Sequence, residues 1–169
     1  AAMFQQDLKG LLAYSTISHL GLITLLLGLN SHLGAVAAIF HIMNHATFKA
    51  SLFMAAGIID HETGTRDLRR LRGLGKLMPI TASLAMVASA AMAGVPLLNG
   101  FLSKEMFFSE ALAATTPIPA VGEFLTYAAT VAGVFSVVYS LRLIHGVFLR
   151  PAPEPLPRVP HAPPRWMRF

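Results

Sequence analysis

The sequence predicts an all-α fold, a polytopic transmembrane helix bundle with four spans, of which the third is a discontinuous (broken) helix. Three observations lead to this prediction. Of the 169 residues, 54% are hydrophobic and only 12% are charged, whereas soluble domains usually carry about 25% charged residues. The apolar residues form four runs, each long enough for the roughly 20 residues that cross a membrane. Nearly all lysines and arginines lie in the segments that four spans would place on one side of the membrane.

The composition also excludes several classes of protein. The chain has no cysteine, so disulfides, thiolate zinc sites and cysteine nucleophiles are ruled out. A net charge of +5 could indicate nucleic acid as a partner. The basic residues, however, fall between apolar runs, as topology determinants do, and no motif that reads RNA or DNA accompanies them. We therefore expect a lipid bilayer as the surroundings and no nucleic acid partner.

The first two expected spans cover residues 8–29 and 33–59. Asp7 stands directly before the first span, where an aspartate side chain can cap the helix. The short turn "NSHLG" separates the two spans, and the charged loop "DHETGTRDLRRLRGLGK" follows the second. This alternation of apolar runs and polar loops indicates two neighbouring membrane helices.

The third expected span, residues 78–115, begins at Met78–Pro79, where proline suits the first helical turn. About 38 helical residues would reach about 57 Å, which is too long for one simple span. The segment "AGVPLLNG" contains Gly94, Pro96 and Gly100, and proline removes a backbone donor inside a helix. We therefore expect a break near residues 94–100. Unwound backbone at membrane depth is tolerated only inside protein or a wet cavity, so the break marks a site.

The fourth expected span, residues 123–149, follows the breaker "TPIP". Residues 1–150 then form a partial membrane repeat, and residues 151–169 form a proline-rich cytoplasmic linker that leads toward a further helix. The chain does not begin with methionine, and it ends on the aromatic and basic cluster "PPRWMRF", which is typical of the flank of another membrane segment. We expect the sequence to be part of a longer protein.

Lysine and arginine predict the orientation of the bundle. Four spans place the N-terminus, the loop of residues 60–77 and the tail on one side. The basic residues of that side are Lys9, Arg66, Arg69, Arg70, Arg72, Lys76 and the arginines from Arg142 onward. The opposite loops, residues 30–32 and 116–122, have none. Both ends of this segment are therefore expected in the cytoplasm, in a multi-pass protein of the cell membrane.

Two lysines do not fit this account of topology. Lys49 lies inside the second span and Lys104 just after the expected break. A charge at this depth costs about 2.5–3.5 kcal/mol on insertion scales, so such residues are functional candidates. Lys49 could instead extend toward the interface, but it is about 15 Å from the end of its span at Ile59. Glu105 follows Lys104 and could tune it, although it points about 100° away around the helix.

His41, His45 and Lys49 are spaced four apart in "AIFHIMNHATFKASLF" and share one helix face. Zinc would need a third ligand, and the stretch lacks the glutamate of the HExxH motif. His19 or His145 could pair with one of these histidines around a haem. A buried structural pair is the plainest alternative. We favour a proton relay, because imidazole can accept a proton on one nitrogen and release it from the other. His19 could belong to the same path.

Three blocks of the sequence resemble a known superfamily: "DLKGLLAYSTISHLG", "AIFHIMNHATFKASLFMAAGIIDHETGTRDLRRLRGLG" and "GVPLLNGFLSKEMFF". They are similar to the antiporter-like membrane proteins shared by Mrp-type cation/proton antiporters and by the proton-pumping part of respiratory complex I. The loop "DHETGTRDLRRL" and the stretch "NGFLSKEMFF" most resemble the large A subunit of Mrp antiporters, and after it they resemble the L subunit of complex I. The similarity covers about residues 7–150.

The resemblance implies a fold of about fourteen helices with two inverted five-helix repeats, in which this chain supplies the tenth to thirteenth. It implies that Lys104 is the lysine of the second broken helix. His41, His45 and Lys49 match the histidine pair and lysine of the eleventh helix in the hydrated proton path. His19 stands where relatives commonly have glutamine. The family's glutamate–lysine pair on earlier helices is absent, so the chain alone is not expected to transport ions.

The expected function is therefore that of part of a monovalent cation (Na+)/proton antiporter, which is a secondary transporter and not an enzyme. The expected proton-path residues are Lys104, His41, His45 and Lys49, with Glu105 and His19 as tuning residues. No metal or other cofactor is expected, and the expected partners are protons, a monovalent cation and the other subunits of an antiporter complex. The alternatives are a proton-pumping subunit of a complex I-type NADH-quinone oxidoreductase and a haem-binding helix bundle.

Overall fold

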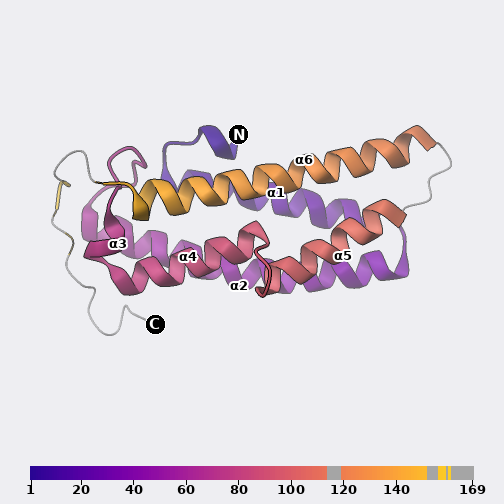
Figure 1. Cartoon of the computed structure of the whole chain (residues 1–169), viewed down its shortest axis with the longest axis horizontal. Helices are drawn as coiled ribbons and strands as arrows, with labels where there is room; N and C mark the ends of the chain where they lie inside the picture. Colours follow the sequence, from indigo (N-terminus) through magenta and orange to yellow (C-terminus); the bar gives the residue numbers. More distant parts are fainter. Residues whose placement is uncertain (114–118, 152–155, 159, 161–169) are drawn as a thin grey trace.

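The computed structural model describes residues 1–113, 119–151, 156–158 and 160, and within these residues it contains helices and no strand. The long helices lie side by side in an elongated bundle (Figure 1). In chain order the elements are η1 (Ala2–Phe4), α1 (Leu8–Gly28), α2 (His32–Thr63), α3 (Leu74–Leu77), α4 (Pro79–Ala93), α5 (Asn99–Ala113), α6 (Pro119–Leu143) and the π-helical segment η2 (Ile144–Leu149). The expected end of the third span at residues 114–115 and most of the proline-rich tail lie outside the described residues.

The helix ends follow from local chemistry. The Asp7 side chain accepts a hydrogen bond from the backbone N–H of Gly10 at 2.6 Å, so the predicted cap of α1 is confirmed. Pro79 occupies the first turn of α4, as predicted. Helix α2 continues one turn beyond the expected span end at residue 59 and stops at Gly64, whose φ of 70° favours glycine. Helix α6 begins four residues before the expected position 123, at Pro119.

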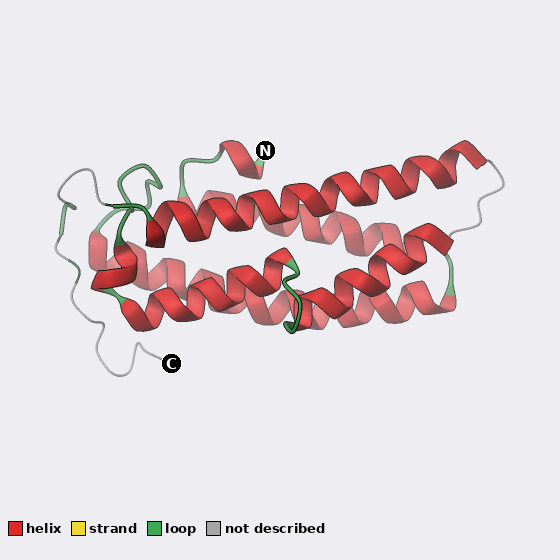
Figure 2. Ribbon diagram, viewed as in Figure 1, coloured by secondary structure: helices red, strands yellow, loops and turns green. Residues whose placement is uncertain are grey.

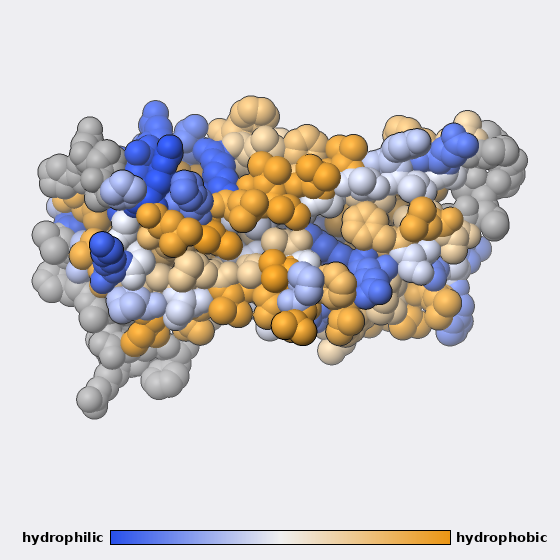
Figure 3. Space-filling model, in the orientation of Figure 1, coloured by the Kyte–Doolittle hydropathy of each residue, from blue (hydrophilic) through white to orange (hydrophobic). Residues whose placement is uncertain are grey.

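The surface of the bundle is rich in apolar side chains. Every long helix exposes some of them, among them Ile17, Ile39, Val87, Leu102 and Val134. Figure 3 shows such side chains over much of the middle of one face. Among the described residues, Leu8–Gly28 and Ala120–Leu149 are long and apolar enough to cross a membrane, and Pro79–Ala93 is apolar but shorter. A helical bundle with this surface is compatible with a bilayer.

The charged loop between α2 and α4 packs against the start of α1. The backbone N–H of Leu8 donates to Arg66 O at 2.9 Å, and that of Leu68 donates to Gln6 O at 2.8 Å. At the same end, a Cβ on Gly75 would lie 2.8 Å from the carbonyl oxygen of Phe148 in η2. The start of α1, this loop and the end of the last helix therefore meet at one end of the bundle (Figure 1).

Helices α4 and α5 follow one another along α2 and are separated by residues 94–98 (Figure 2). The connection is tight, since Gly94 has a φ of 85° and Leu97 a φ of 75°. A Cβ on Gly100 would lie only 1.8 Å from Ala91 O, so the first turn of α5 packs directly on the last turn of α4. Only glycine permits this approach.

Candidate functional site

A layer of buried polar side chains separates two apolar clusters of the bundle. One cluster joins the start of α1 to α4 and η2, and the other joins the end of α1 to α5. The buried polar layer comprises Ser15, His19, His41, Asn44, Lys49, Ser103, Lys104, Ser136 and Ser140, each at most 8% exposed. Such groups are costly to bury unless they are hydrogen-bonded, so their partners define the site.

Two histidines from neighbouring helices are hydrogen-bonded to each other in this layer. His19 Nδ1 on α1 lies 3.0 Å from His41 Nε2 on α2. The other nitrogen of each ring also has a partner: His19 Nε2 lies 3.0 Å from the Tyr139 hydroxyl on α6, and His41 Nδ1 lies 3.0 Å from Ser103 Oγ on α5. A continuous line of hydrogen bonds thus joins four helices through the centre of the bundle.

His45 lies beside this line without being bonded into it. Its ring centroid is 5.4 Å from that of His19 and 6.4 Å from that of His41. Phe48 meets its ring edge-on, with the centroids 5.5 Å apart. Its Nε2 atom is buried and has no hydrogen-bond partner among the described residues. The three imidazoles therefore form one cluster, with His45 toward Lys49 on α2.

Lys104 spans the break between α4 and α5. Its Nζ donates to Ala93 O at 2.8 Å and to Ser136 Oγ on α6 at 2.7 Å. Ala93 is the last residue of α4, where helix carbonyls lack partners and the helix dipole favours a cation. A Cβ on Gly94 would lie 2.8 Å from Lys104 Cδ, so the lysine side chain packs against the backbone of the break.

Lys49 is held in the same way as Lys104. Its Nζ donates to Leu12 O on α1 at 3.1 Å and to the hydroxyl of Ser15. Ser15 in turn donates to Leu12 O at 2.8 Å. Each of the two buried amines is therefore bound by one serine hydroxyl and one backbone carbonyl, which are neutral acceptors.

The two buried amines differ from the other lysines and arginines in their partners. Among the described residues, neither Lys49 nor Lys104 makes an ion pair with a carboxylate. Glu105, expected as a possible tuning residue, is exposed and is not part of the buried layer. Two asparagines instead join α2 to the start of α5 in this layer. Asn44 Nδ2 donates to Asn99 O at 3.2 Å, and Asn99 Nδ2 donates to Asn44 Oδ1 at 3.1 Å.

The arrangement suits proton transfer better than metal or haem binding. No group of three or more histidine, aspartate or glutamate side chains able to hold a metal is found in the described part of the chain. His19 and His41 use both ring nitrogens for hydrogen bonds, so neither nitrogen is free for iron. Two further histidines were considered for haem: His45, whose buried Nε2 has no hydrogen-bond partner among the described residues, and His145, which is exposed. Imidazole and hydroxyl groups at hydrogen-bond distance can pass protons.

Sequence reasoning identified the amines and imidazoles but missed their hydroxyl partners. Ser15, Ser103, Ser136 and Tyr139 are all at most 2% exposed and bind the expected site residues. Ser103 directly precedes Lys104, and Ser136 and Tyr139 are three apart and share a face of α6. These positions could have predicted the hydroxyl partners, since small polar residues in an apolar run often face another helix.

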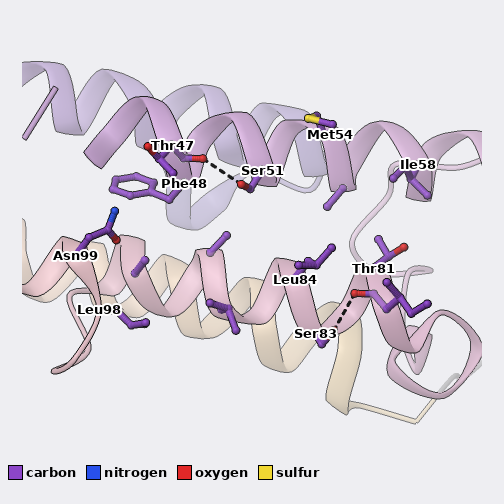
Figure 4. Close-up of a pocket in the computed structure, with 15 residues that line it drawn as sticks. Thr47, Phe48, Ser51, Met54, Ile58, Thr81, Ser83, Leu84, Leu98 and Asn99 are labelled. Atoms are coloured by element: carbon purple, nitrogen blue, oxygen red, sulfur yellow. Dashed lines mark hydrogen bonds between the residues drawn. The ribbon is translucent and has the colours of Figure 1, made fainter. Parts of the chain in front are cut away.

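An apolar groove lies beside the polar layer, between α2 and α4 (Figure 4). Its volume is about 640 Å³, and Thr47, Ser51, Met54 and Leu84 are among its lining residues. Ser51 Oγ donates to Thr47 O within α2, at 3.0 Å. The lining contains no charged side chain, so the groove does not extend the row of amines and imidazoles.

Comparison with known proteins decides the family. The model of a family described as "NADH:quinone oxidoreductase/Mrp antiporter, TM" matches residues 1–136. The chain belongs to this family. Membership confirms the resemblance to antiporter-like membrane proteins that the sequence blocks indicated, and it makes the chain a membrane protein.

Individual members of the family agree with this assignment. The chain is 74% identical over 167 residues to a probable K+/H+ antiporter A/B subunit of Rhizobium meliloti, and the match covers 99% of the chain. It is 48% identical to the Na+/H+ antiporter A subunit of Alkalihalophilus pseudofirmus, and this match covers 88% of the present chain. The chain spans only 17% and 21% of these two relatives.

A solved structure of the Mrp complex from Dietzia sp. DQ12-45-1b has the same fold over 99% of the chain. The TM-score is 0.84 and the sequence identity is 42%, and the match covers 18% of the chain in that complex. The helical arrangement described above is thus similar to that of one part of this solved complex.

Proposed function

We propose that this chain forms part of the A subunit of an Mrp-type monovalent cation/proton antiporter, where it supplies part of the proton path. Lys104 is the central proton-binding group. His41 and His45 relay protons, and Lys49 continues the path along α2. Glu105 is exposed and acts on Lys104 at most from a distance, whereas His19 takes part directly through its bond to His41.

One observation carries the proposal: the hydrogen-bonded line His19–His41–Ser103, which lies in a buried layer and ends at the residue directly before Lys104 in the sequence. Lysine readily changes its protonation state when it is buried, and imidazole does so near neutral pH. Ionisable residues inside a membrane mark ion and proton pathways. The buried layer that holds this line also holds Lys104 and Lys49.

The proposed topology has four spans. Helices α1, α2 and α6 each cross the bilayer once, and α4 and α5 together form one span interrupted at residues 94–98. The end that carries the start of α1, the charged loop and the tail faces the cytoplasm, because the loop arginines and lysines gather there. The interruption then lies near the membrane middle, lined by protein.

The partners follow from the family. The remaining helices of a full-length protein, the other subunits of a multisubunit complex and lipid would surround this segment. The transported species are protons and a monovalent cation. The relatives above are named for K+ and for Na+, so both cations belong in any assay. The assembly acts as a secondary transporter, with no chemical reaction at this segment.

The test uses the full-length protein in its complex, reconstituted into vesicles with a pH-sensitive dye inside. Lys104→Ala is expected to abolish proton-coupled Na+ or K+ exchange while the complex still assembles. Lys76→Ala is the matched control, because Lys76 is exposed in the short helix α3. Undiminished exchange by an assembled Lys104→Ala complex would refute the proposed role.

The family description favours a second candidate, a proton-pumping subunit of a complex I-type NADH-quinone oxidoreductase. The same residues would then move protons in response to electron transfer in neighbouring subunits. Purification of the native complex distinguishes the two functions. Flavin and iron–sulfur absorbance together with NADH oxidation would favour the pump, and cation/proton exchange without redox cofactors would favour the antiporter.

A further inference from the structure

The directions of the hydrogen bonds along the histidine line follow from the groups at its ends. Ser103 Oγ lies 3.2 Å from Gly100 O. In this bond the serine donates its single hydroxyl hydrogen, since a carbonyl oxygen can only accept. Ser103 accepts from His41 in this arrangement, which places a hydrogen on His41 Nδ1.

The remaining directions follow one by one. A neutral imidazole carries one hydrogen, so His41 Nε2 is an acceptor, and His19 Nδ1 must donate to it. His19 Nε2 is then an acceptor as well. It accepts from the Tyr139 hydroxyl, 3.0 Å away. All donors therefore point the same way, from Tyr139 on α6 to the carbonyl of Gly100 at the start of α5.

We propose that Tyr139 is a positioning residue that favours this direction together with the Ser103–Gly100 bond at the other end, and that neither end alone fixes the tautomers of His19 and His41. The Tyr139 hydroxyl donates to His19 and so disfavours a hydrogen on His19 Nε2. His41 is consequently kept with its Nδ1 hydrogen directed at Ser103, the neighbour of Lys104, and with its Nε2 lone pair ready to receive a proton. This inference rests on the proposed function.

The surroundings of Tyr139 support this role. The side chain is 2% exposed, and its ring packs edge-on against that of His19, with the centroids 6.4 Å apart. Ser136, which binds Lys104, lies one turn earlier on the same face of α6. Helix α6 thus contacts both ends of the path: Ser136 holds the lysine and Tyr139 orients the histidines.

The proton step is balanced within the site. An excess proton bound by His19 first converts its ring to an imidazolium. Transfer of the Nδ1 hydrogen to His41 Nε2 then breaks one N–H bond and forms another, and it leaves His19 neutral and His41 as the imidazolium. In this step Tyr139 keeps its own hydrogen and provides only direction. Its loss should therefore reduce exchange without abolishing it.

The experiment compares Tyr139→Phe with Tyr127→Phe in the full-length antiporter complex. Tyr127 lies about three turns earlier on the same helix and is 71% exposed. We expect Tyr139→Phe to slow exchange by about tenfold, and we expect Tyr127→Phe to stay within about twofold of wild type. Wild-type exchange by Tyr139→Phe would overturn the proposal.

Two variants of His19 separate positioning from packing. Glutamine can accept from Tyr139 and donate to His41 but cannot carry a proton, so His19→Gln should slow exchange while His41 keeps its Nδ1 hydrogen. His19→Leu can do neither and should leave His41 with a mixture of tautomers, as Tyr139→Phe does. If the 15N chemical shifts showed His41 to be as mixed in His19→Gln as in His19→Leu, the hydrogen-bond direction would not be what fixes the tautomer, and the proposal would fall.

A direct measurement covers the case in which a variant does not assemble. The 15N chemical shifts of His41 in the wild-type complex distinguish its tautomers. The proposal requires hydrogen on Nδ1, with a mixture of tautomers in Tyr139→Phe, and hydrogen on Nε2 in the wild type would overturn it. Lys104→Ala in the same panel tests the proposed function itself: if it keeps exchange, that function fails, whereas loss in Lys104→Ala with full activity in Tyr139→Phe removes only this inference.

Discussion

Charged side chains have opposite kinds of partner at one end of the bundle and in its middle. At the end, opposite charges pair: Lys9 Nζ lies 2.8 Å from an oxygen of Asp60, and Arg69 lies 2.8 Å from Asp67. In the middle, Lys49 and Lys104 have only hydroxyl and carbonyl partners among the described residues. The first arrangement neutralises charge, and the second only solvates it.

The difference shows how a site can stay able to exchange protons. A carboxylate beside a buried amine stabilises the charged pair, and removal of a proton then leaves an uncompensated anion in a medium where that is costly. A hydroxyl or carbonyl accepts a hydrogen bond from the ammonium but carries no charge when the proton leaves. The partners of Lys49 and Lys104 therefore support the proposed proton path. At the end of the bundle, the Lys9–Asp60 pair joins α1 to α2, and the Arg69–Asp67 pair lies within the loop.

The sharpest way to break this contrast is to give Lys104 the kind of partner that Lys9 has. Ser136→Asp would place a carboxylate beside the Lys104 amine, since Ser136 Oγ is 2.7 Å from Nζ. A charge-assisted bond of this kind is about twice as strong as a neutral one. We expect proton-coupled exchange in the full-length complex to fall by about 100-fold, because the ammonium would be held in its charged form.

Ser136→Asn is the control for this substitution. The amide has nearly the same shape as the carboxylate and still offers an oxygen to Lys104, but it carries no charge. We expect it to retain most of the exchange activity. Equal loss in the two variants, measured at equal amounts of assembled complex, would show that packing around Ser136 matters and its charge does not.

A second comparison removes one lysine from each region. Lys49→Gln takes away a buried amine of the proposed path and should reduce exchange about tenfold. Lys9→Gln removes the ion pair with Asp60, in which the Lys9 side chain is 37% exposed and the Asp60 side chain 31% exposed. This substitution should change exchange by no more than about twofold. Similar losses in both variants would contradict the division into two regions.

Much of this arrangement could be predicted from the sequence, because it depends on single helices. Asp7 and Pro79 predicted helix starts that the structure confirms. Their effects are local, since a cap or a first-turn proline acts within one turn. The depth of Lys49 and Lys104 in apolar runs likewise marked them as unusual before any packing was known.

Contacts between helices could not be predicted in this way. Periodicity shows that His41 and His45 share a face of α2, but it does not show which helix packs against that face. His19 was expected as a tuning residue that could belong to the same path, but the sequence did not show that it bonds directly to His41. Tyr139 lies 120 residues from His19 in the sequence, and no local pattern connects them. Glu105 was considered because it adjoins Lys104, but adjacent residues on a helix point in different directions.

A substitution in the backbone of the break should have a smaller effect on exchange, because it only displaces Lys104 from its carbonyl partner. Gly94 has a φ of 85°, and a Cβ there would meet Lys104 Cδ at 2.8 Å. Gly94→Ala should therefore strain the turn by about 1–3 kcal/mol and displace the lysine from Ala93 O. We expect exchange to fall several-fold. Gly57→Ala is the matched control, since nothing lies within 4 Å of a Cβ at that position in α2, and equal activity of the two variants would show that the approach of Lys104 to the break is unimportant.

The smallest effect is expected at the charged end. Hydrogen bonds from the Arg69 side chain, and then from its backbone N–H, lower the pKa of Asp67 from 3.8 to about 2. This pKa is lower in the folded protein than in the unfolded chain, so the ionised carboxylate of Asp67 stabilises the folded state. The stabilisation is complete above about pH 4 and is lost as the pH falls from about 4 to about 2. Asp67→Asn should lower the unfolding temperature slightly at neutral pH, and its difference from wild type should shrink as the medium is acidified to about pH 3. Thermal unfolding of the purified complex at several pH values measures this, with proton-coupled exchange unchanged at neutral pH. A difference that stayed constant down to pH 3 would show that the carboxylate of Asp67 is not what Arg69 stabilises in the loop.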